Sequence, residues 1–188
     1  ISDERLSDGR RRVYGHVAPK GACHIGYAGI CKTVPAGTRY EEFNEKRGAT
    51  RVACDCGSGE EAEIPTGVVT FGTSHMRDLR ASAEAAMDHY ERTGMAICDV
   101  VAGVDQFGPC VFGATKPGVT DEQVELLRGA AVSVDVRPLR GAPQLIAVLA
   151  CNVHGLGVHR QEFHIKDGEI TALVASGLNV EVGGTLTA

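Results

Sequence analysis

A serine on a strand of alternating valines is the first candidate for chemistry. In the segment AAVSVDVRPLRG, residues 130–141, three valines alternate with Ser133, Asp135 and Arg137. Because alternate side chains of a strand point to opposite faces, this pattern predicts one apolar face and one polar face. A serine hydroxyl becomes a nucleophile when a base, usually histidine, lies within hydrogen-bonding reach. The polar face is therefore either a solvated surface or the place of a nucleophilic Ser133.

Seven histidines could supply the base, and two of them flank the clearest expected helix. Apolar residues at helical spacing predict a helix over 76–92, with His75 at its start and His89 near its end. On a continuous helix these two side chains would lie about 21 Å apart, so only one could contact Ser133. The helix dipole lowers the pKa of His75 at one end and favours an imidazolium at the other end. The dipole thus leaves the choice open, and each histidine could equally be an ordinary helical residue.

The seven cysteines form two groups. Three lie in apolar segments and are expected to be small core residues: Cys98, Cys110 and Cys151. Four lie in the glycine-rich N-terminal third: Cys23, Cys31, Cys54 and Cys56. Their spacing differs from the paired C-x2–4-C motifs of structural zinc sites, so free thiols or a Cys23–Cys31 disulfide are favoured over zinc. We expect no metal and no other cofactor.

The elements expected around these residues are mostly strands. Apolar and alternating runs predict strands at 12–18, 50–56, 64–72, 95–104, 109–115, 130–141, 144–153, 158–165 and 169–176. A second helix is expected over 120–129, where Thr120 and Gln123 form a capping box. This pattern predicts a strand-dominated α+β fold, a closed or nearly closed β-barrel with helices packed outside. We expect an N-terminal arm at 1–11, the barrel domain at 12–175 and an extended C-terminal arm at 176–188.

Composition disfavours two classes of partner. The chain has 19 Lys and Arg against 24 Asp and Glu, a net charge of −5, whereas binding to nucleic acid phosphates needs clustered cations. No apolar run reaches the roughly 18 residues of a membrane span. The first residues, ISDERLSDGRRR, are polar and do not form a secretory signal. Because they include no initiator methionine, we expect a trimmed chain or a portion of a longer product.

Several segments together resemble one protein family. They are RVYGHVAPKGACHIGYAGIC, VTFGTSHM, the run from AAMDHYERTG through SVDVRPLRG, and QLIAVLACNVHGLGVHR, and they cover roughly residues 12–160. These segments resemble the prohead, or capsid maturation, proteases of actinobacterial tailed phages. That group is similar to the wider class of phage prohead proteases and herpesvirus assemblins, in which a helix-wrapped β-barrel carries a Ser–His pair. The resemblance implies an assemblin-like barrel with Ser133 as nucleophile and His89 as base, although His75 also lies in a motif typical of the group.

The chain departs from the family pattern at several positions. Val134 and Val136 replace a glycine and a tryptophan, and Gln144 replaces an acidic residue. A branched side chain after the nucleophile is expected to crowd the site. The third catalytic member stays open: His75, His154 or none. Arg137 and Arg140 are candidates for holding the oxyanion, directly or through water, and the alternative for both is a solvated strand end.

The resemblance implies a serine endopeptidase that cleaves scaffold and capsid protein tails, including its own chain, during phage head maturation. Its partners would be capsid and scaffolding proteins, with the protease a homo-oligomer or bound to the capsid. It would act in the bacterial host cytoplasm, inside the prohead or virion, with no membrane and no nucleic acid required. The alternative is a catalytically degenerate domain of the same fold that serves as a capsid-associated structural or scaffolding protein.

Overall fold

The computed structural model describes residues 1–3, 5–24, 29–45, 48–53, 61–151, 161–166 and 169–175. The chain divides into two compact units, Ile1–Gly157 and Val158–Ala188. In the second unit, β8 (Gln161–Lys166) and β9 (Glu169–Ala175) form a two-stranded antiparallel sheet. The expected C-terminal arm at 176–188 lies outside the described residues. Everything that follows concerns the first unit.

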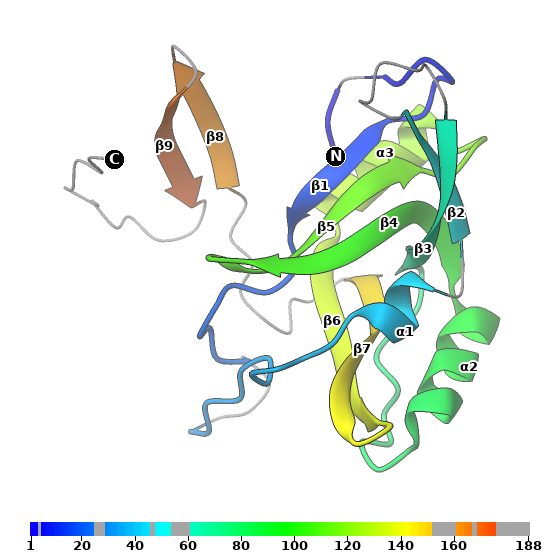
Figure 1. The fold of residues 1–188 in the computed structure, drawn as a ribbon, viewed down its shortest axis with the longest axis vertical. Helices are drawn as coiled ribbons and strands as arrows, with labels where there is room; N and C mark the ends of the chain where they lie inside the picture. Colours follow the sequence, from blue (N-terminus) through cyan, green and yellow to red (C-terminus); the bar gives the residue numbers. More distant parts are fainter. Residues whose placement is uncertain are drawn as a thin grey trace. The chain divides into compact units, whose positions relative to one another are not determined.

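One curled sheet of seven strands is the main element of the first unit (Figure 1). Its strands are β1 (Arg12–His16), β2 (Gly48–Ala53), β3 (Glu61–Phe71), β4 (Met95–Asp105), β5 (Gly108–Thr115), β6 (Ala131–Leu139) and β7 (Ala142–Cys151). They follow the order β1-β5-β4-β3-β7-β6, and β2 pairs with β3 beside this path. The β3–β7 pair is parallel, and the other pairs are antiparallel.

The sheet is open, because its path ends at β1 on one side and at β6 on the other. The strand-dominated α+β prediction is confirmed, and the architecture is a curled half-barrel rather than a closed barrel. The path also explains where Ser133 lies. The chain leaves β5, passes through helix α3 (Asp121–Gly129) and starts the β6–β7 hairpin at the far end of the sheet. The candidate nucleophile is therefore on an end strand.

One apolar core gathers side chains from most of the sheet. Its buried members are Val13, Val17, Phe43, Val69, Ile97, Cys98, Val100, Ala102, Val111, Leu145, Val148 and Ala150. The three valines of β6 pack against this core, as their alternation predicts. Phe43, on the short helix α1 (Glu41–Asn44), packs against β3 at Gly67. A Cβ atom on Gly67 would lie 2.2 Å from the Phe43 ring, so only glycine fits there.

Helix α2 (Ala83–Thr93) covers the opposite face of β7 and makes a second core. Ala83, Ala86 and Tyr90 of the helix pack with three β7 residues, Ile146, Ala147 and Leu149. Strand β7 is thus buried on both faces, which explains why its sequence is a continuous apolar run. Helix α2 thus packs beside the β6–β7 strand pair that carries Ser133 (Figure 1).

Helix α2 begins seven residues later than the sequence predicts, at Ala83 rather than at residue 76. Two local hydrogen bonds explain the late start. The Asp78 carboxylate accepts from the Arg80 N–H, which makes a turn, and the Ser82 hydroxyl caps the helix by accepting from the Ala85 N–H. Residues 72–82 therefore form a loop between β3 and α2, called here the 72–82 loop.

The second predicted helix is confirmed. Helix α3 follows Thr120, whose hydroxyl accepts from the Gln123 N–H while the Gln123 side chain accepts from the Thr120 N–H. This is the expected capping box. Among the described residues, no helix is both long enough and apolar enough to span a membrane.

Candidate active site

Ser133 and His75 are in direct contact. The Ser133 Oγ lies 2.8 Å from the His75 Nε2. Ser133 is on β6 and only 1 % exposed, and His75 is half-buried in the 72–82 loop. A serine hydroxyl hydrogen-bonded to an imidazole nitrogen is the arrangement that a nucleophile and its general base require.

His89, the base that the family resemblance implies, contacts a different group. It lies on α2, where its Nε2 is 3.3 Å from the main-chain oxygen of Ser74. The structure therefore brings Ser133 together with His75 instead of His89. The physical reason is the late start of α2, which leaves His75 in a loop that can turn toward β6. A single continuous helix would have fixed the two histidines far apart along its axis.

Burial favours the neutral form of the His75 imidazole. Desolvation lowers the pKa of His75 below its ordinary value of 6.5; Asp135 opposes this effect, and His24 and Arg137 reinforce it. The helix dipole is not the cause, because the helix starts eight positions further along the chain. In the tautomer that carries its proton on Nδ1, a neutral His75 accepts the serine proton through Nε2.

The polar face of β6 is buried, so it is not a solvated surface. Ser133, Asp135 and Arg137 are all less than a tenth exposed. The Tyr90 hydroxyl on α2 donates to the Asp135 Oδ2 at 2.5 Å. Arg137 donates to the same carboxylate through Nε and Nη2, at 3.1 to 3.2 Å. Burial, reinforced by the Asp135 carboxylate, raises the pKa of Tyr90 well above its ordinary value, so the hydroxyl keeps its proton.

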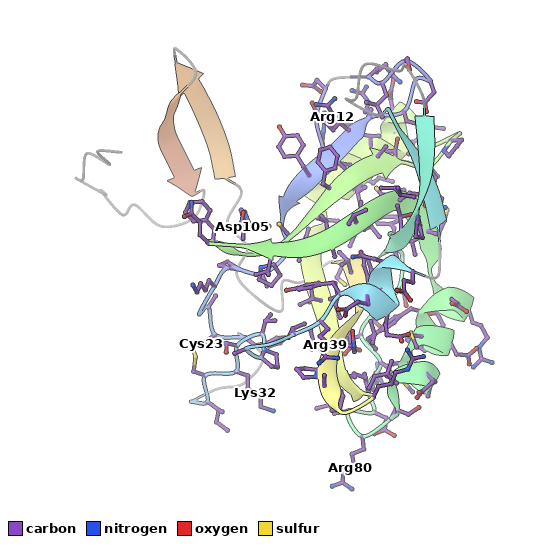
Figure 2. The ribbon with its side chains drawn as sticks, in the orientation of Figure 1. Arg12, Cys23, Lys32, Arg39, Arg80 and Asp105 are labelled. Carbon is purple, nitrogen blue, oxygen red and sulfur yellow. A yellow bond between two sulfur atoms is a disulfide. The ribbon has the colours of Figure 1, made fainter. Side chains whose placement is uncertain are left out.

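The same side chains also hold the 72–82 loop. Arg137 Nη1 donates to the main-chain oxygens of Asp78, at 3.2 Å, and Ala81, at 2.8 Å. The main-chain N–H of Met76, the residue after His75, donates to the Tyr90 hydroxyl at 3.2 Å. By contrast, the side chain of Arg80 in the same loop points away from the unit (Figure 2). The loop thus turns its backbone toward β6 and an exposed side chain outward.

Neither arginine considered for the oxyanion has its hydrogen bonds directed at Ser133. The guanidinium of Arg137 is bonded to Asp135 and to the loop, and the Cα of Arg137 lies about 13 Å along the strand from the Cα of Ser133. Arg140 lies in the β6–β7 turn, exposed, and forms an ion pair with the buried carboxylate of Glu42. The alternative of a plain strand end thus fits the exposure of Arg140, whereas Arg137 is a buried member of the site.

The departures from the family pattern are placed in two different environments. Val134 and Val136 face the apolar core, opposite to the Ser133 hydroxyl, so their branched side chains do not crowd that hydroxyl. Gln144 pairs with Arg137 across the β6–β7 hairpin and is buried. Its Oε1 has no hydrogen-bond partner in the described part of the chain.

A third catalytic member is not assigned by the described residues. Within them, Ser133 is the hydrogen-bond partner of the His75 ring. His154 lies outside the described residues, and so do Cys54 and Cys56. Cys23 and Cys31 form a disulfide, which was one of the two alternatives favoured over zinc (Figure 2). No group of three or more His, Cys, Asp or Glu side chains that could hold a metal is present among residues that the structure describes.

The fold and the site together define a strand-dominated α+β protein in which a buried serine on an end strand contacts a half-buried histidine of the 72–82 loop. No family model, no curated protein and no solved structure matches the chain.

Proposed function

We propose that this protein is a serine endopeptidase that processes scaffold and capsid protein tails during phage head maturation, including its own chain. The contact between the Ser133 Oγ and the His75 Nε2 carries this proposal. The resemblance to prohead proteases supplies the substrate class. We further propose that the half-barrel is an assemblin-like barrel wrapped by helices. The enzyme would act inside the prohead or virion in the host cytoplasm, as a homo-oligomer or bound to the capsid.

The reaction uses the pair in two halves. His75 Nε2 takes the hydroxyl proton of Ser133 while the Oγ attacks the carbonyl carbon of the scissile peptide bond. The resulting imidazolium then gives this proton to the leaving amine, and an acyl-enzyme remains on Ser133. A water molecule, deprotonated by His75 in the same way, hydrolyses the ester and restores the hydroxyl. His75 replaces His89 as the proposed base because its ring contacts the hydroxyl.

The burial of Ser133 favours a second candidate function. With 1 % of Ser133 exposed, a peptide carbonyl reaches the hydroxyl only after the side chains or backbone that cover it move. A catalytically inactive domain would keep this closed arrangement and act as a capsid-associated structural or scaffolding protein. The two functions differ in one observable property, which is whether Ser133 reacts.

Fluorophosphonate labelling and mass spectrometry of chain termini, after co-expression with a scaffold, separate the two functions. We expect label on Ser133 and cleaved termini in the wild type. Ser133→Ala should lose both, and His75→Ala should slow labelling by about 100-fold or more. His89→Ala should keep both, because its ring contacts a main-chain oxygen and not Ser133.

Ser74→Ala is the matched control, because Ser74 is an exposed serine next to His75. It should label and process like the wild type. Loss of labelling in His89→Ala, with labelling retained in His75→Ala, would return the base to His89. A folded wild type that neither labels nor processes would leave the structural function.

A further inference from the structure

We propose that Tyr90, Asp135 and Arg137 form a positioning cluster that holds His75 against Ser133. The three side chains come from α2 and β6 and bond to one another below the 72–82 loop. None of them contacts the Ser133 hydroxyl in the described hydrogen bonds, so they are positioning residues and not catalytic residues. The catalytic part of this inference rests on the proposed function, whereas the structural part does not.

The loop needs such support because it has no regular structure of its own. Residues 72–82 contain bends and turns, and one large apolar side chain in the loop, Leu79, is 70 % exposed. Met76 packs partly buried against the second core, so apolar burial anchors that residue and not the stretch around Leu79. The cluster binds the loop backbone at three points instead: the N–H of Met76 and the carbonyls of Asp78 and Ala81. These points begin directly after His75 and continue to the start of α2.

The cluster is also tied to the nucleophile through the backbone. Asp135 lies two residues from Ser133 on the same face of β6, about 6.6 Å along the strand. Tyr90 lies on a helix face that packs against β7, the strand paired with β6. The positions of His75 and Ser133 are thus both set relative to the β6–β7 strand pair. A shift of about 1 Å between reacting groups lowers rates by about 100-fold, so a fixed reference for His75 has a catalytic consequence.

A purely structural role would not require charged groups at this place. A buried ion pair is often replaced by packed apolar residues with no loss of stability. Here Arg137 satisfies a carboxylate and two loop carbonyls at once, which needs the planar, multiply donating guanidinium. The charged groups of the cluster thus give the loop a defined geometry that apolar packing would not supply.

Tyr90→Phe tests the inference, because it removes one hydroxyl and keeps the ring. We expect the maximal rate of fluorophosphonate labelling to fall about 10- to 100-fold, with the half-saturating probe concentration unchanged within about twofold. A second readout, NMR titration of the His75 ring, needs no activity. In the wild type, Ser133→Ala should shift the titration midpoint of His75, because it removes the bonded hydroxyl. When Ser133→Ala is added to the Tyr90→Phe variant, the titration midpoint of His75 should not change, because the hydroxyl and the imidazole are no longer in contact there.

Tyr14→Phe is the matched control, since Tyr14 is exposed on β1 at the opposite end of the sheet path. It should behave like the wild type in both readouts. Arg137→Lys is the second variant, which keeps the charge but not the forked geometry, and it should give the same labelling loss as Tyr90→Phe. Thermal melts establish that each variant is folded.

The outcomes separate the two proposals. Normal labelling of folded Tyr90→Phe and Arg137→Lys, or an unchanged Ser133–His75 coupling in Tyr90→Phe, would overturn the positioning cluster and leave the proposed function intact. A wild type that never labels would overturn the proposed function, and the NMR coupling alone would then decide the cluster. A wild type without that coupling would overturn the cluster as well.

Discussion

Replacing Arg137 with methionine measures the cost of leaving the Asp135 carboxylate buried without its counter-charge. The side chains of Arg137 and Asp135 are 7 % and 10 % exposed, and two guanidinium nitrogens donate to the carboxylate. Methionine keeps most of the apolar stem and removes the cation, so the carboxylate stays buried without its counter-charge. Removing one member of a buried pair in this way costs about 3–5 kcal/mol. We expect the free energy of unfolding to fall by this amount.

Urea unfolding measures the change, and the signal should come from tyrosine, because the chain has four tyrosines and no tryptophan. The midpoint should fall while the denaturant slope stays constant, as expected when stability alone changes. Tyr90 is buried in the same cluster, so near-ultraviolet circular dichroism reports on this region directly.

The double variant Asp135→Asn, Arg137→Met gives the decisive comparison. Asparagine removes the uncompensated charge and keeps the shape, so the double variant should be more stable than Arg137→Met by roughly 1–4 kcal/mol. Independent sites would instead add their losses within about 0.5 kcal/mol. An additive result, or a loss below about 1 kcal/mol in Arg137→Met, would refute the argument that this pair is buried and coupled.

Three further predictions concern other parts of the first unit. Because burial lowers the pKa of His75, labelling of Ser133 should persist as the pH falls through 6.5, which labelling rates measured across pH will test. The free energy of unfolding should decrease below pH 6.5, because the unfolded chain there binds a proton that folded His75 does not, and urea midpoints across pH measure this decrease. Gly113→Ala places a Cβ 2.0 Å from the main-chain oxygen of Asp99, so urea unfolding should show a loss of about 1–3 kcal/mol. Thr120→Ala removes the capping hydroxyl of α3 and should lower the urea-derived stability by about 1 kcal/mol, and an unchanged midpoint would contradict the capping role.

Local signals in the sequence predict several elements well. The alternation in β6 separates the valines from Ser133, Asp135 and Arg137, and the two sets do face opposite sides. The continuous apolar run of β7 predicts a strand buried on both faces, and the capping box at Thr120 predicts the start of α3. The capping box is decided by a contact three residues away, whereas the two strands are identified by the period and the continuity of their apolar side chains.

The start of α2 shows how a wrong boundary changes an assignment of function. Leu79 extends the apolar stripe at helical spacing, yet its side chain is exposed. The signals for a later start are present in the sequence: Asp78 two residues before Arg80, and Ser82 as an N-cap. A helix that starts at residue 76 places His75 and His89 too far apart for both to reach Ser133. In the structure they are near neighbours, since the His89 ring contacts Ser74.

The alternation of apolar and polar residues in β6 does not predict that its polar face is buried. Alternation shows which side chains share a face, but the segment that covers this face is set by contacts between α2 and β7, far away in sequence. Each polar side chain of β6 meets a group from residues 75–90: Ser133 meets His75, Asp135 meets Tyr90, and Arg137 meets the loop carbonyls. Buried polar groups need hydrogen-bond partners. The polar face of β6 and residues 75–90 supply these partners to each other, so neither can be buried without the other. Removing a partner group from this set, such as the Tyr90 hydroxyl or the Arg137 guanidinium, should therefore alter the contact between the hydroxyl and the imidazole even though it touches neither group.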